Sequence, residues 1–239
     1  MSWSQMQPLL SQACGETLIM VGWSTLIAVA GGLPLGVLLV LTDRGGLLRN
    51  AAVNKAVGVV VNLGRSLPFL ILMISVLPFT RWVIGTTIGA EAMVVPLSMG
   101  AIPFLARLAE TAVREVDGGL VEAVQAMGGS TWTVVRKALL PEALPSLIAG
   151  LTTTVIALIG YSAMAGTIGG GGLGDLAIRY GYQRFETSLM LVTIGVLVVI
   201  VTLVQLTGDL AARAASHRGR TSTAPRMRLL RPAATPEAS

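Results

Sequence analysis

The stretch EAVQAMGGSTWTVVRKALLPEALP, residues 122–145, links two strongly apolar parts of the chain. Its Gly128-Gly129 pair predicts a sharp turn between two short helices, because a residue without a Cβ atom reaches positive φ at little cost. Asp117 is placed to cap the first helix, and Ser130 is placed to cap the second. The sequence therefore predicts two short helices here rather than a simple loop.

Apolar residues in both predicted helices recur at helical spacing, which is typical of faces that pack against another surface. They are Leu120, Val124 and Met127 in the first helix and Trp132, Val135 and Leu139 in the second. Pro141 and Pro145 are expected to restart the chain as the next helix. The whole connection, about 114–141, is too long for a simple connector, so we expect it to have a function.

Composition places most of the chain in a lipid bilayer. Of the 239 residues, 53% are hydrophobic and only 12% are charged, and the mean hydropathy is +0.75. These values lie outside the range of soluble domains and indicate one membrane domain. The lone Cys14 excludes an internal disulfide, and no cluster of Cys and His could hold a metal. No nucleophile with its base and no pair of carboxylates is grouped in the sequence, so it does not indicate an enzyme.

Uncharged intervals predict an all-α integral membrane protein with about five transmembrane helices, since crossing roughly 30 Å of hydrocarbon takes about 20 helical residues. The predicted spans are about 17–42, 56–80, 88–112, 143–168 and 187–208. Arg65 interrupts the second span. We expect 1–16 to be an extracytoplasmic N-terminal segment and 213–239 to be a basic, disordered cytoplasmic tail.

The distribution of Lys and Arg predicts the orientation, because positively charged loops stay in the cytoplasm. With the N-terminus outside, thirteen of the 17 Lys and Arg lie on the inner side, and only Arg81, Arg179 and Arg184 lie on the outer side. The C-terminus is then cytoplasmic. Topology explains the net charge of +5 better than nucleic-acid binding does, and the six arginines of the tail are expected to attract the anionic lipid bilayer.

The 122–145 stretch resembles the cytoplasmic signature loop of ABC importer permeases, because five of its residues stand at the spacing of that loop: Glu122, Ala123, Gly128, Leu140 and Pro141. Val124 and Ala138 depart from the family pattern, although both remain apolar. The resemblance implies that a cytoplasmic ABC ATPase docks on a short helix that presents a carboxylate and an apolar patch. The residues expected to couple to the ATPase are Glu122, Ala123, Met127, Gly128, Leu140 and Pro141. The alternative is an amphipathic loop that lies on the membrane surface.

Two further segments, NLGRSLPFLILMISVLPFTRWVIGTTIG (62–89) and GYSAMAGTIGGGGLGDLAIRYGYQRF (160–185), resemble methionine-importer permeases. With the signature loop, the similarity runs roughly from 16 to 213, and only the basic tail departs from it. The resemblance implies the type I ABC importer permease fold over 17–212, in the inner membrane of a bacterium, with the coupling loop at 114–141.

The resemblance also implies an ATP-driven importer of methionine, with the D-isomer left open as a second substrate. The assembly would contain a second copy of this chain, an ATPase dimer that binds ATP and Mg, and a substrate-binding lipoprotein, while this chain would bind no cofactor. A permease of the same class for a polar amino acid or an organic ion remains an alternative. A secondary transporter is less favoured, because the sequence has neither internal repeats nor charges grouped at mid-membrane.

An ionisable residue within a span is costly in lipid and is therefore a functional candidate. Arg65 is such a residue, and it lies in the motif RSLPF with Ser66 and Pro68. Pro68 cannot donate a backbone hydrogen bond, so it frees a carbonyl one turn earlier, which is tolerated where a helix lines a cavity or packs on protein. We expect Arg65 to face the solute path or an interface; the alternative is an arginine that snorkels to the nearby cytoplasmic end.

The fourth span offers candidates for a gate. Tyr161, Ser162 and Met164 stand there among small residues. The two hydroxyls would contact an amino acid in transit, and the polarisable Met164 would close the pore. Ordinary helix packing is the alternative for each of the three.

Glycines mark a second turn at 169–172, which is not a phosphate-binding loop because no Lys-Ser or Lys-Thr follows it. We expect a flexible turn on the outer side that faces the solute receptor. Asp175, Arg179 and Tyr180 are its expected contacts with that receptor. A plain helix end is the alternative.

Small residues in the first and fifth spans allow close helix contact. They are Gly31, Gly32 and Gly36 in the first span and Gly195 in the fifth. The sequence does not separate a contact within one subunit from a contact between two copies.

Overall fold

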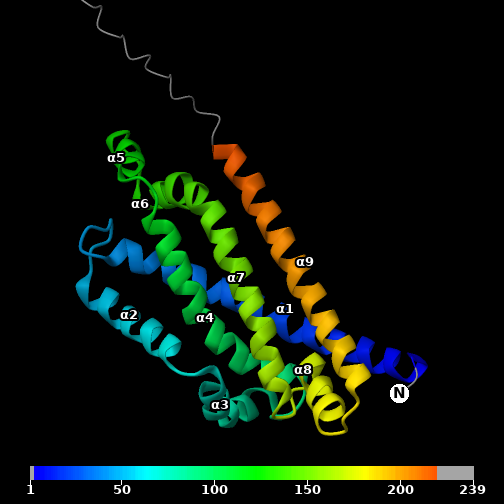
Figure 1. Ribbon diagram of the computed structural model, residues 1–239. Helices are drawn as coiled ribbons and strands as arrows, with labels where there is room; N and C mark the ends of the chain where they lie inside the picture. The colour runs from blue at the N-terminus through cyan, green and yellow to red at the C-terminus, as the bar shows by residue number, and fades with distance from the viewer. Residues whose placement is uncertain (1–2, 220–239) are drawn as a thin grey trace, which may run out of the picture.

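The structure, a computed structural model, describes residues 3–219, with side chains up to 216, and this part of the chain is helical apart from its turns (Figure 1). The elements in chain order are α1 (Trp3–Thr42), α2 (Ala51–Ser66), α3 (Phe69–Ile84), α4 (Ala90–Arg114), α5 (Gly118–Ala126), α6 (Thr131–Val134), the π-helical η1 (Val135–Leu139), α7 (Leu140–Gly166), α8 (Gly172–Leu176), the π-helical η2 (Ala177–Tyr182) and α9 (Thr187–Gly219). Within the described residues, four helices are long and apolar enough to span a membrane, and α2 with α3 forms a fifth, bent candidate. The predicted all-α membrane fold is confirmed.

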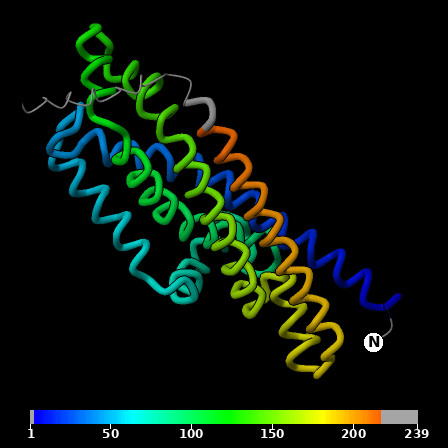
Figure 2. Tube along the Cα trace, turned by 45° about the horizontal axis from the view of Figure 1, so that its top comes forward, coloured from blue at the N-terminus to red at the C-terminus, as the bar shows by residue number. Residues whose placement is uncertain are grey.

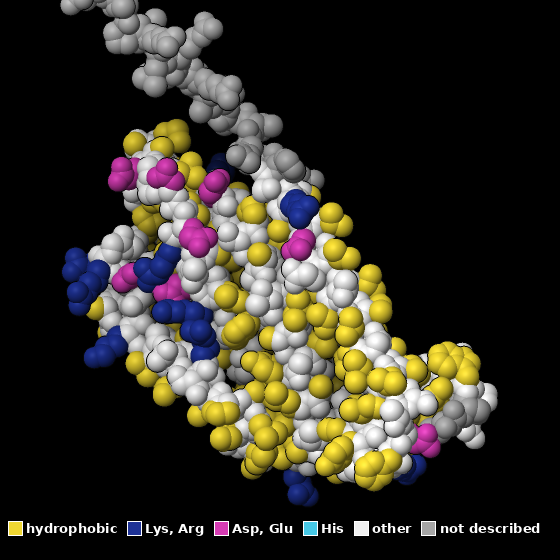
Figure 3. All heavy atoms as spheres, in the orientation of Figure 1, with side chains coloured by type: hydrophobic (Ala, Val, Ile, Leu, Met, Phe, Trp, Pro, Cys, Tyr) yellow, Lys and Arg dark blue, Asp and Glu magenta, His cyan; other side chains and the backbone are white. Residues whose placement is uncertain are grey.

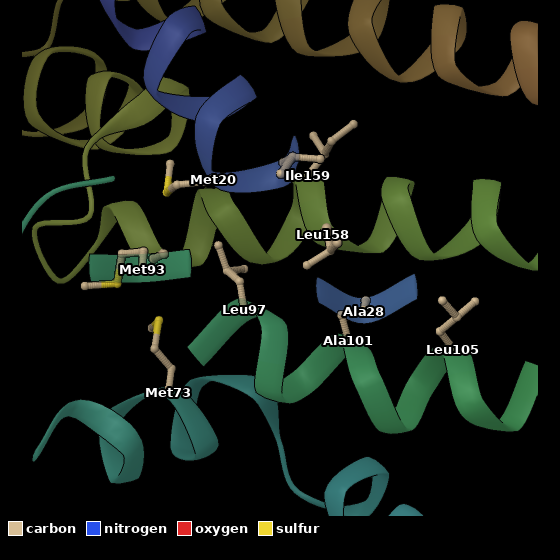
Figure 4. Packing of buried hydrophobic residues seen from close by; sticks show 11 residues of the cluster. Met20, Ala28, Met73, Met93, Leu97, Ala101, Leu105, Leu158 and Ile159 are labelled. Carbon is tan, nitrogen blue, oxygen red and sulfur yellow. The ribbon is translucent and has the colours of Figure 1, made fainter. Parts of the chain in front are cut away.

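The main core lies where α1, α3, α4 and α7 meet (Figure 4). Met73 of α3, Leu97 of α4 and Leu158 of α7 are fully buried there, and α1 contributes Met20 and Ala28. Figure 2 shows α1 crossing the bundle against α4 and α7. The core thus joins the beginning of the chain to helices far along it.

Glycines let α1 approach α4 closely. A Cβ atom added to Gly36 would lie 2.5 Å from the carbonyl oxygen of Ala106, and one added to Gly32 would lie 2.9 Å from that of Ile102. A side chain does not fit at such distances, so these glycines serve a contact within one subunit. Gly195 differs from them, because no atom of the described chain lies within 4 Å of its added Cβ.

The second predicted span, about 56–80, is wrong as one continuous helix. The chain forms α2 and α3 instead, and the two are bent by 110° at a short break (Figure 2). Leu67 has the extended values φ −81° and ψ 132°, because the ring of Pro68 disfavours a helical conformation in the residue before it. The proline divides the span and leaves Arg65 in the last turn of α2.

The first helix begins earlier than predicted. α1 starts at Trp3, so residues 3–16 are the beginning of a 40-residue helix and not a separate segment. Met6 and Leu10 on this part are buried in a cluster with Leu173 of α8. Tertiary packing of this kind supplies most of the stability of a helix, which explains the extension.

The last helix continues farther than predicted. α9 ends at Gly219, so the prediction of a disordered tail over 213–239 is wrong for 213–219. The run Ala-Ala-Arg-Ala-Ala at this point consists of strong helix formers, which continue the helix. Residues 220–239 lie outside the described chain, and the prediction for them stays a prediction.

Charged side chains are concentrated toward one end of the molecule. Figure 3 shows Lys, Arg, Asp and Glu gathered around α5 and the nearby end of α2, while hydrophobic side chains cover the middle of the same face. Trp23, Val60 and Leu203 are among the large hydrophobic residues exposed on the chain. Such a distribution is expected where the middle of a protein lies in hydrocarbon.

Candidate functional site

The helix α5 stands at one end of the molecule and has no buried residue (Figure 1). Glu122 and Ala123 are exposed, and 79% of the surface of Met127 is exposed. We call Leu120, Val124 and Met127 the apolar face of α5. Leu120 and Met127 of this face are uncovered in the single chain, as a docking surface for another protein would be, whereas Val124 packs against the cluster that contains Val135 and Leu139.

Three predicted local features around α5 are confirmed. The carboxylate of Asp117 accepts a hydrogen bond from the backbone N–H of Gly119 at 2.8 Å, and the hydroxyl of Ser130 accepts one from Thr133 at 3.3 Å. These side chains cap the helices that follow them. Gly128 has a φ of +79°, and a Cβ added there would meet no atom within 4 Å. Backbone conformation alone therefore requires glycine at this position.

The second predicted short helix is not a separate element. α6, η1 and α7 form one continuous helix over Thr131–Gly166. Pro141 does not restart the chain, because η1 is a π-helical turn in which the N–H of Leu140 donates to the carbonyl of Val135. The wider turn accommodates the proline ring, which would clash in a regular helix. A single rigid element thus runs from the Gly128 turn into the membrane.

The apolar stripe predicted for this helix is confirmed in part. Val135 and Leu139 are buried, whereas Trp132 is 69% exposed. Trp132 and Leu140 line an apolar groove of about 550 Å³ between this helix and α1, and Pro141 is exposed. The exposed indole is typical of tryptophan at a membrane interface.

A pocket of about 840 Å³ lies between α5 and the turn after α1, and its lining includes Glu122. Arg114, at the end of α4, donates at 2.6 Å to Asp43 in that turn and at 2.9 Å to Glu110. Helical spacing of i and i+4 could have indicated the second pair. Sequence reasoning missed the first, because its members stand 71 positions apart and only the packing of α1 on α4 brings them together.

The Arg114 side chain also lowers the pKa of Asp43. Its hydrogen bond, followed in importance by that from the backbone N–H of Arg44, holds the pKa of Asp43 below the ordinary value. Both donors stabilise the ionised carboxylate. The turn that carries Asp43, outside the spanning helices, is thereby tied to α4 next to α5.

Two of the predicted path residues lie at one small pocket. Arg65 and Tyr161 line a pocket of about 160 Å³ beside the break between α2 and α3. The ring of Tyr161 stacks on that of Phe69, with centroids 4.3 Å apart and planes inclined by 9°. The rest of the lining consists of Gly64, Leu67, Leu72, Gly100 and Phe104. Four helices, α2, α3, α4 and α7, meet at this site.

The other path candidates lie elsewhere. Ser162 is 3% exposed, and its hydroxyl donates to the carbonyl of Ile159 at 2.8 Å. Its side chain points away from that of Tyr161 because consecutive helical residues are rotated by about 100°, so the predicted pair of hydroxyls does not form. Ser66 donates within its own helix to Asn62. Met164 is exposed and lies outside the 160 Å³ pocket.

The turn at 169–172 is packed against α1 rather than free, which corrects the prediction of a flexible turn. The backbone N–H of Gly172 donates to the carboxylate of Glu16 at 2.6 Å, and that of Leu173 donates to the hydroxyl of Thr17 at 2.9 Å. With φ at +77°, a Cβ on Gly172 would lie 2.7 Å from that hydroxyl oxygen. Sequence reasoning missed these contacts, because the partners stand 156 positions apart.

The predicted receptor contacts are only partly available. Asp175 is 7% exposed and pairs with Arg179, whose own side chain is exposed. Tyr180 is half-buried, and the guanidinium of Arg184 lies 4.5 Å from the centre of its ring, a cation–π contact. Of the three predicted contacts, Arg179 is therefore exposed, whereas Asp175 is buried.

Comparison with known proteins identifies the family. The sequence model of the binding-protein-dependent transport system inner membrane component matches residues 32–217. The chain is 51% identical over 210 residues to the probable D-methionine transport system permease protein MetI of Vibrio cholerae, which covers 88% of this chain and 93% of that protein. It is 49% identical over 173 residues to the methionine import system permease protein MetP of Bacillus subtilis, covering 72% of this chain and 78% of that protein.

Solved structures agree with the sequence comparison. A chain from an inward-facing conformation of the MetNI methionine ABC transporter is 45% identical and superposes with a TM-score of 0.87, covering 90% of this chain and 99% of that one. A chain from an amino acid ABC transporter crystallised with histidines, 17% identical with a TM-score of 0.72 over 88% and 96% of the two chains, shares the fold. The chain is therefore a multi-pass inner membrane protein that belongs to the family of binding-protein-dependent transport system inner membrane components.

Proposed function

We propose that this chain is the permease subunit of an ATP-driven ABC importer and that it moves methionine into the cytoplasm. The observation that carries the proposal is the 51% identity, over 88% of the chain, to a D-methionine transport permease. The TM-score of 0.87 against a methionine ABC transporter supports it. The L- and D-isomers are both candidate substrates, because the relatives' names refer to methionine and to D-methionine.

The uncovered apolar face of α5 supports a cytoplasmic ATPase dimer as the partner. Met127 and Leu120 offer apolar surface, and Glu122 offers a carboxylate, on a short helix whose start is capped. ATP and Mg would be bound by the ATPase, and this chain would perform no covalent chemistry. Closure of the ATPase dimer would move α5, and the continuous helix Thr131–Gly166 would carry that movement into the membrane.

A second copy of this chain and a substrate-binding lipoprotein complete the proposed assembly. The N-terminus would be outside and the C-terminus inside, as the distribution of Lys and Arg predicts. This orientation places α5 on the ATPase side. It places Arg179 and Arg184 on the side of the lipoprotein, where both are exposed.

Uptake of labelled methionine into proteoliposomes tests the proposal. The chain is reconstituted with its ATPase and its lipoprotein, and L-methionine, D-methionine and a panel of polar amino acids are compared. We expect saturable uptake of methionine that requires ATP hydrolysis and stops when vanadate blocks the ATPase. Uptake of a polar amino acid in place of methionine would support the role as a permease but contradict methionine as its substrate. Uptake without the ATPase would contradict the ATP-driven mechanism.

A further inference from the structure

The pocket beside the break between α2 and α3 combines one cation with aromatic surface. Arg65 and Tyr161 are the only ionisable residues among the described side chains that line it, and the lining has no carboxylate. Phe69 and Phe104 supply further aromatic surface. A lining of this kind suits a ligand that has one carboxylate and one apolar part.

The charge of Arg65 has no counterpart among the side chains that the structure describes. Arg107 and Arg114 in α4 each pair with Glu110. In the part of the chain that the structure describes, Arg65 forms neither an ion pair nor a side-chain hydrogen bond. An arginine at the break of a membrane-crossing segment is costly unless it has a partner or faces water, and Arg65 is exposed. The anionic group of a bound solute would supply that partner.

Close packing fixes the walls of the pocket. A Cβ on Gly64 would lie 2.7 Å from Cγ of Pro103 in α4, and one on Gly100 would lie 3.3 Å from the ring of Phe69. Phe69 in turn stacks on Tyr161 of α7. The width of the pocket therefore depends on how α7 stands relative to α2, α3 and α4.

The lining matches the chemistry of a zwitterionic amino acid with a thioether side chain. A guanidinium binds a carboxylate through two parallel hydrogen bonds, and aromatic rings attract both a thioether sulfur and an ammonium group. The volume of about 160 Å³ is below that of pockets for drug-sized ligands. It is close to the roughly 150 Å³ that takes up benzene in an engineered cavity. The site thus has room for a small solute only.

We propose that this pocket binds the transported amino acid within the membrane, with the carboxylate on Arg65 and the side chain against Phe69, Phe104 and Tyr161. The inference rests on the proposed function and deepens it by naming a site. Tyr161 belongs to the continuous helix that begins beside the Gly128 turn. Movement of α5 therefore reaches the pocket through one rigid element and changes its width.

Photoaffinity labelling with a diazirine analogue of methionine tests the site in the permease–ATPase complex held in lipid nanodiscs. In the wild type we expect labels in 64–72 and at Tyr161, with competition by methionine but not by methioninol, which lacks the carboxylate. Arg65→Gln should lower this labelling by about tenfold or more, as expected for loss of a charge-assisted hydrogen-bonded pair, and Arg65→Lys should lower it less. Arg81→Gln, an exposed arginine at the other end of α3, is the matched control and should label like the wild type.

The outcomes separate this inference from the proposed function. Unchanged labelling in Arg65→Gln, or equal competition by methioninol, would overturn the role of Arg65. Labelling confined to other parts of the permease would overturn the site itself. Either result leaves the proposed function standing if wild-type proteoliposomes take up methionine. Absence of methionine uptake by wild-type proteoliposomes would contradict the proposed function and this inference with it.

Discussion

Two glycine turns at opposite ends of the molecule share a backbone conformation but not an environment (Figure 1). Gly128 follows α5 with a φ of +79°, and Gly172 begins α8 with a φ of +77°. A Cβ added at Gly128 meets no atom within 4 Å, whereas one at Gly172 would lie 2.7 Å from the hydroxyl oxygen of Thr17. Backbone conformation alone requires the first glycine, while packing also requires the second.

The difference separates an exposed helix, the proposed docking surface for the ATPase, from a joint that holds the fold together. α5 has no buried residue, so little of the chain depends on its exact placement. At the other turn, Glu16 and Thr17 of α1 accept the first two N–H groups of α8, which fastens the beginning of the chain to its later helices. Substitutions at the α5 turn should change transport, and substitutions at the α8 turn should change folding.

The largest expected effect is loss of the folded protein in Gly172→Val. The branched side chain would overlap Thr17 and Met20 and would strain a positive φ, which together cost about 2–5 kcal/mol. This is a large share of the roughly 5–15 kcal/mol that keeps a domain folded. Size-exclusion chromatography and thermal melting of the detergent-purified protein should show aggregation and a lower melting temperature.

Gly195→Val in α9 is the matched control, because its added Cβ meets no atom within 4 Å and its φ is not positive. This variant should melt like the wild type. A Gly172→Val protein that also melts like the wild type would contradict the description of the α8 turn as a joint.

The next effect in size is loss of transport without loss of the fold in Gly128→Leu. The substitution strains φ by roughly 1–2 kcal/mol but meets open space, so the protein should still insert and purify. Relief of the strain would move Glu122 and Met127 away from their proposed contacts with the ATPase. We expect ATP-dependent uptake to fall about tenfold, the effect of roughly 1.4 kcal/mol, while ATP hydrolysis measured in the same proteoliposomes continues.

Gly85→Leu is the control that separates the effect of backbone strain from the effect of its position in the molecule. Gly85 ends α3 with a φ of +87° and has no atom within 4 Å of an added Cβ. The backbone cost is therefore the same, but the position is away from α5. Uptake should remain near the wild-type rate, and an equal loss in both variants would show that strain, rather than the placement of α5, limits transport.

The two turns also show what the sequence can predict. The caps by Asp117 and Ser130 and the positive φ of Gly128 follow from short-range rules, and all three are confirmed. Apolar intervals predict the membrane fold in the same way, because they depend on composition along the chain. The contacts of Glu16 and Thr17 reach partners 156 positions away, so no local pattern could indicate them. The meeting of Arg65 and Tyr161 at one pocket depends likewise on helix packing.

Two prolines show the same limit of prediction from sequence. Pro68 separates two helices that are bent by 110°, whereas Pro141 is accommodated in a continuous helix by the π-helical turn before it. The chemistry of the residue is the same in both places. At Pro141 the preceding turn is held by buried side chains, Val135 and Leu139, while Leu67 before Pro68 is exposed. Sequence alone predicts an interruption at either site, and packing decides whether the helix survives.

The smallest expected effect concerns the ion pair beside the α5 turn, removed by Asp43→Asn. The hydrogen bond from Arg114 holds the pKa of Asp43 below its ordinary value, near 3.9 in the unfolded chain. The contribution to stability is therefore present above about pH 4 and is lost as the pH falls through the folded pKa. The variant should melt slightly below the wild type at pH 7, and the two melting temperatures should converge as the pH falls through the lowered pKa of Asp43.

Asp209→Asn is the matched control for this last effect, because Asp209 accepts a hydrogen bond from Gln205 at 2.9 Å but forms no ion pair with a described residue. Its melting temperature should stay parallel to that of the wild type across the pH series. Exposed ion pairs often contribute little, so an Asp43→Asn protein that melts like the wild type but transports slowly would assign the pair a different role. The pair would then hold the turn after α1 in place beside Glu122. Transport would in that case depend on where the α5 region lies, whereas the α8 turn contributes to the stability of the fold.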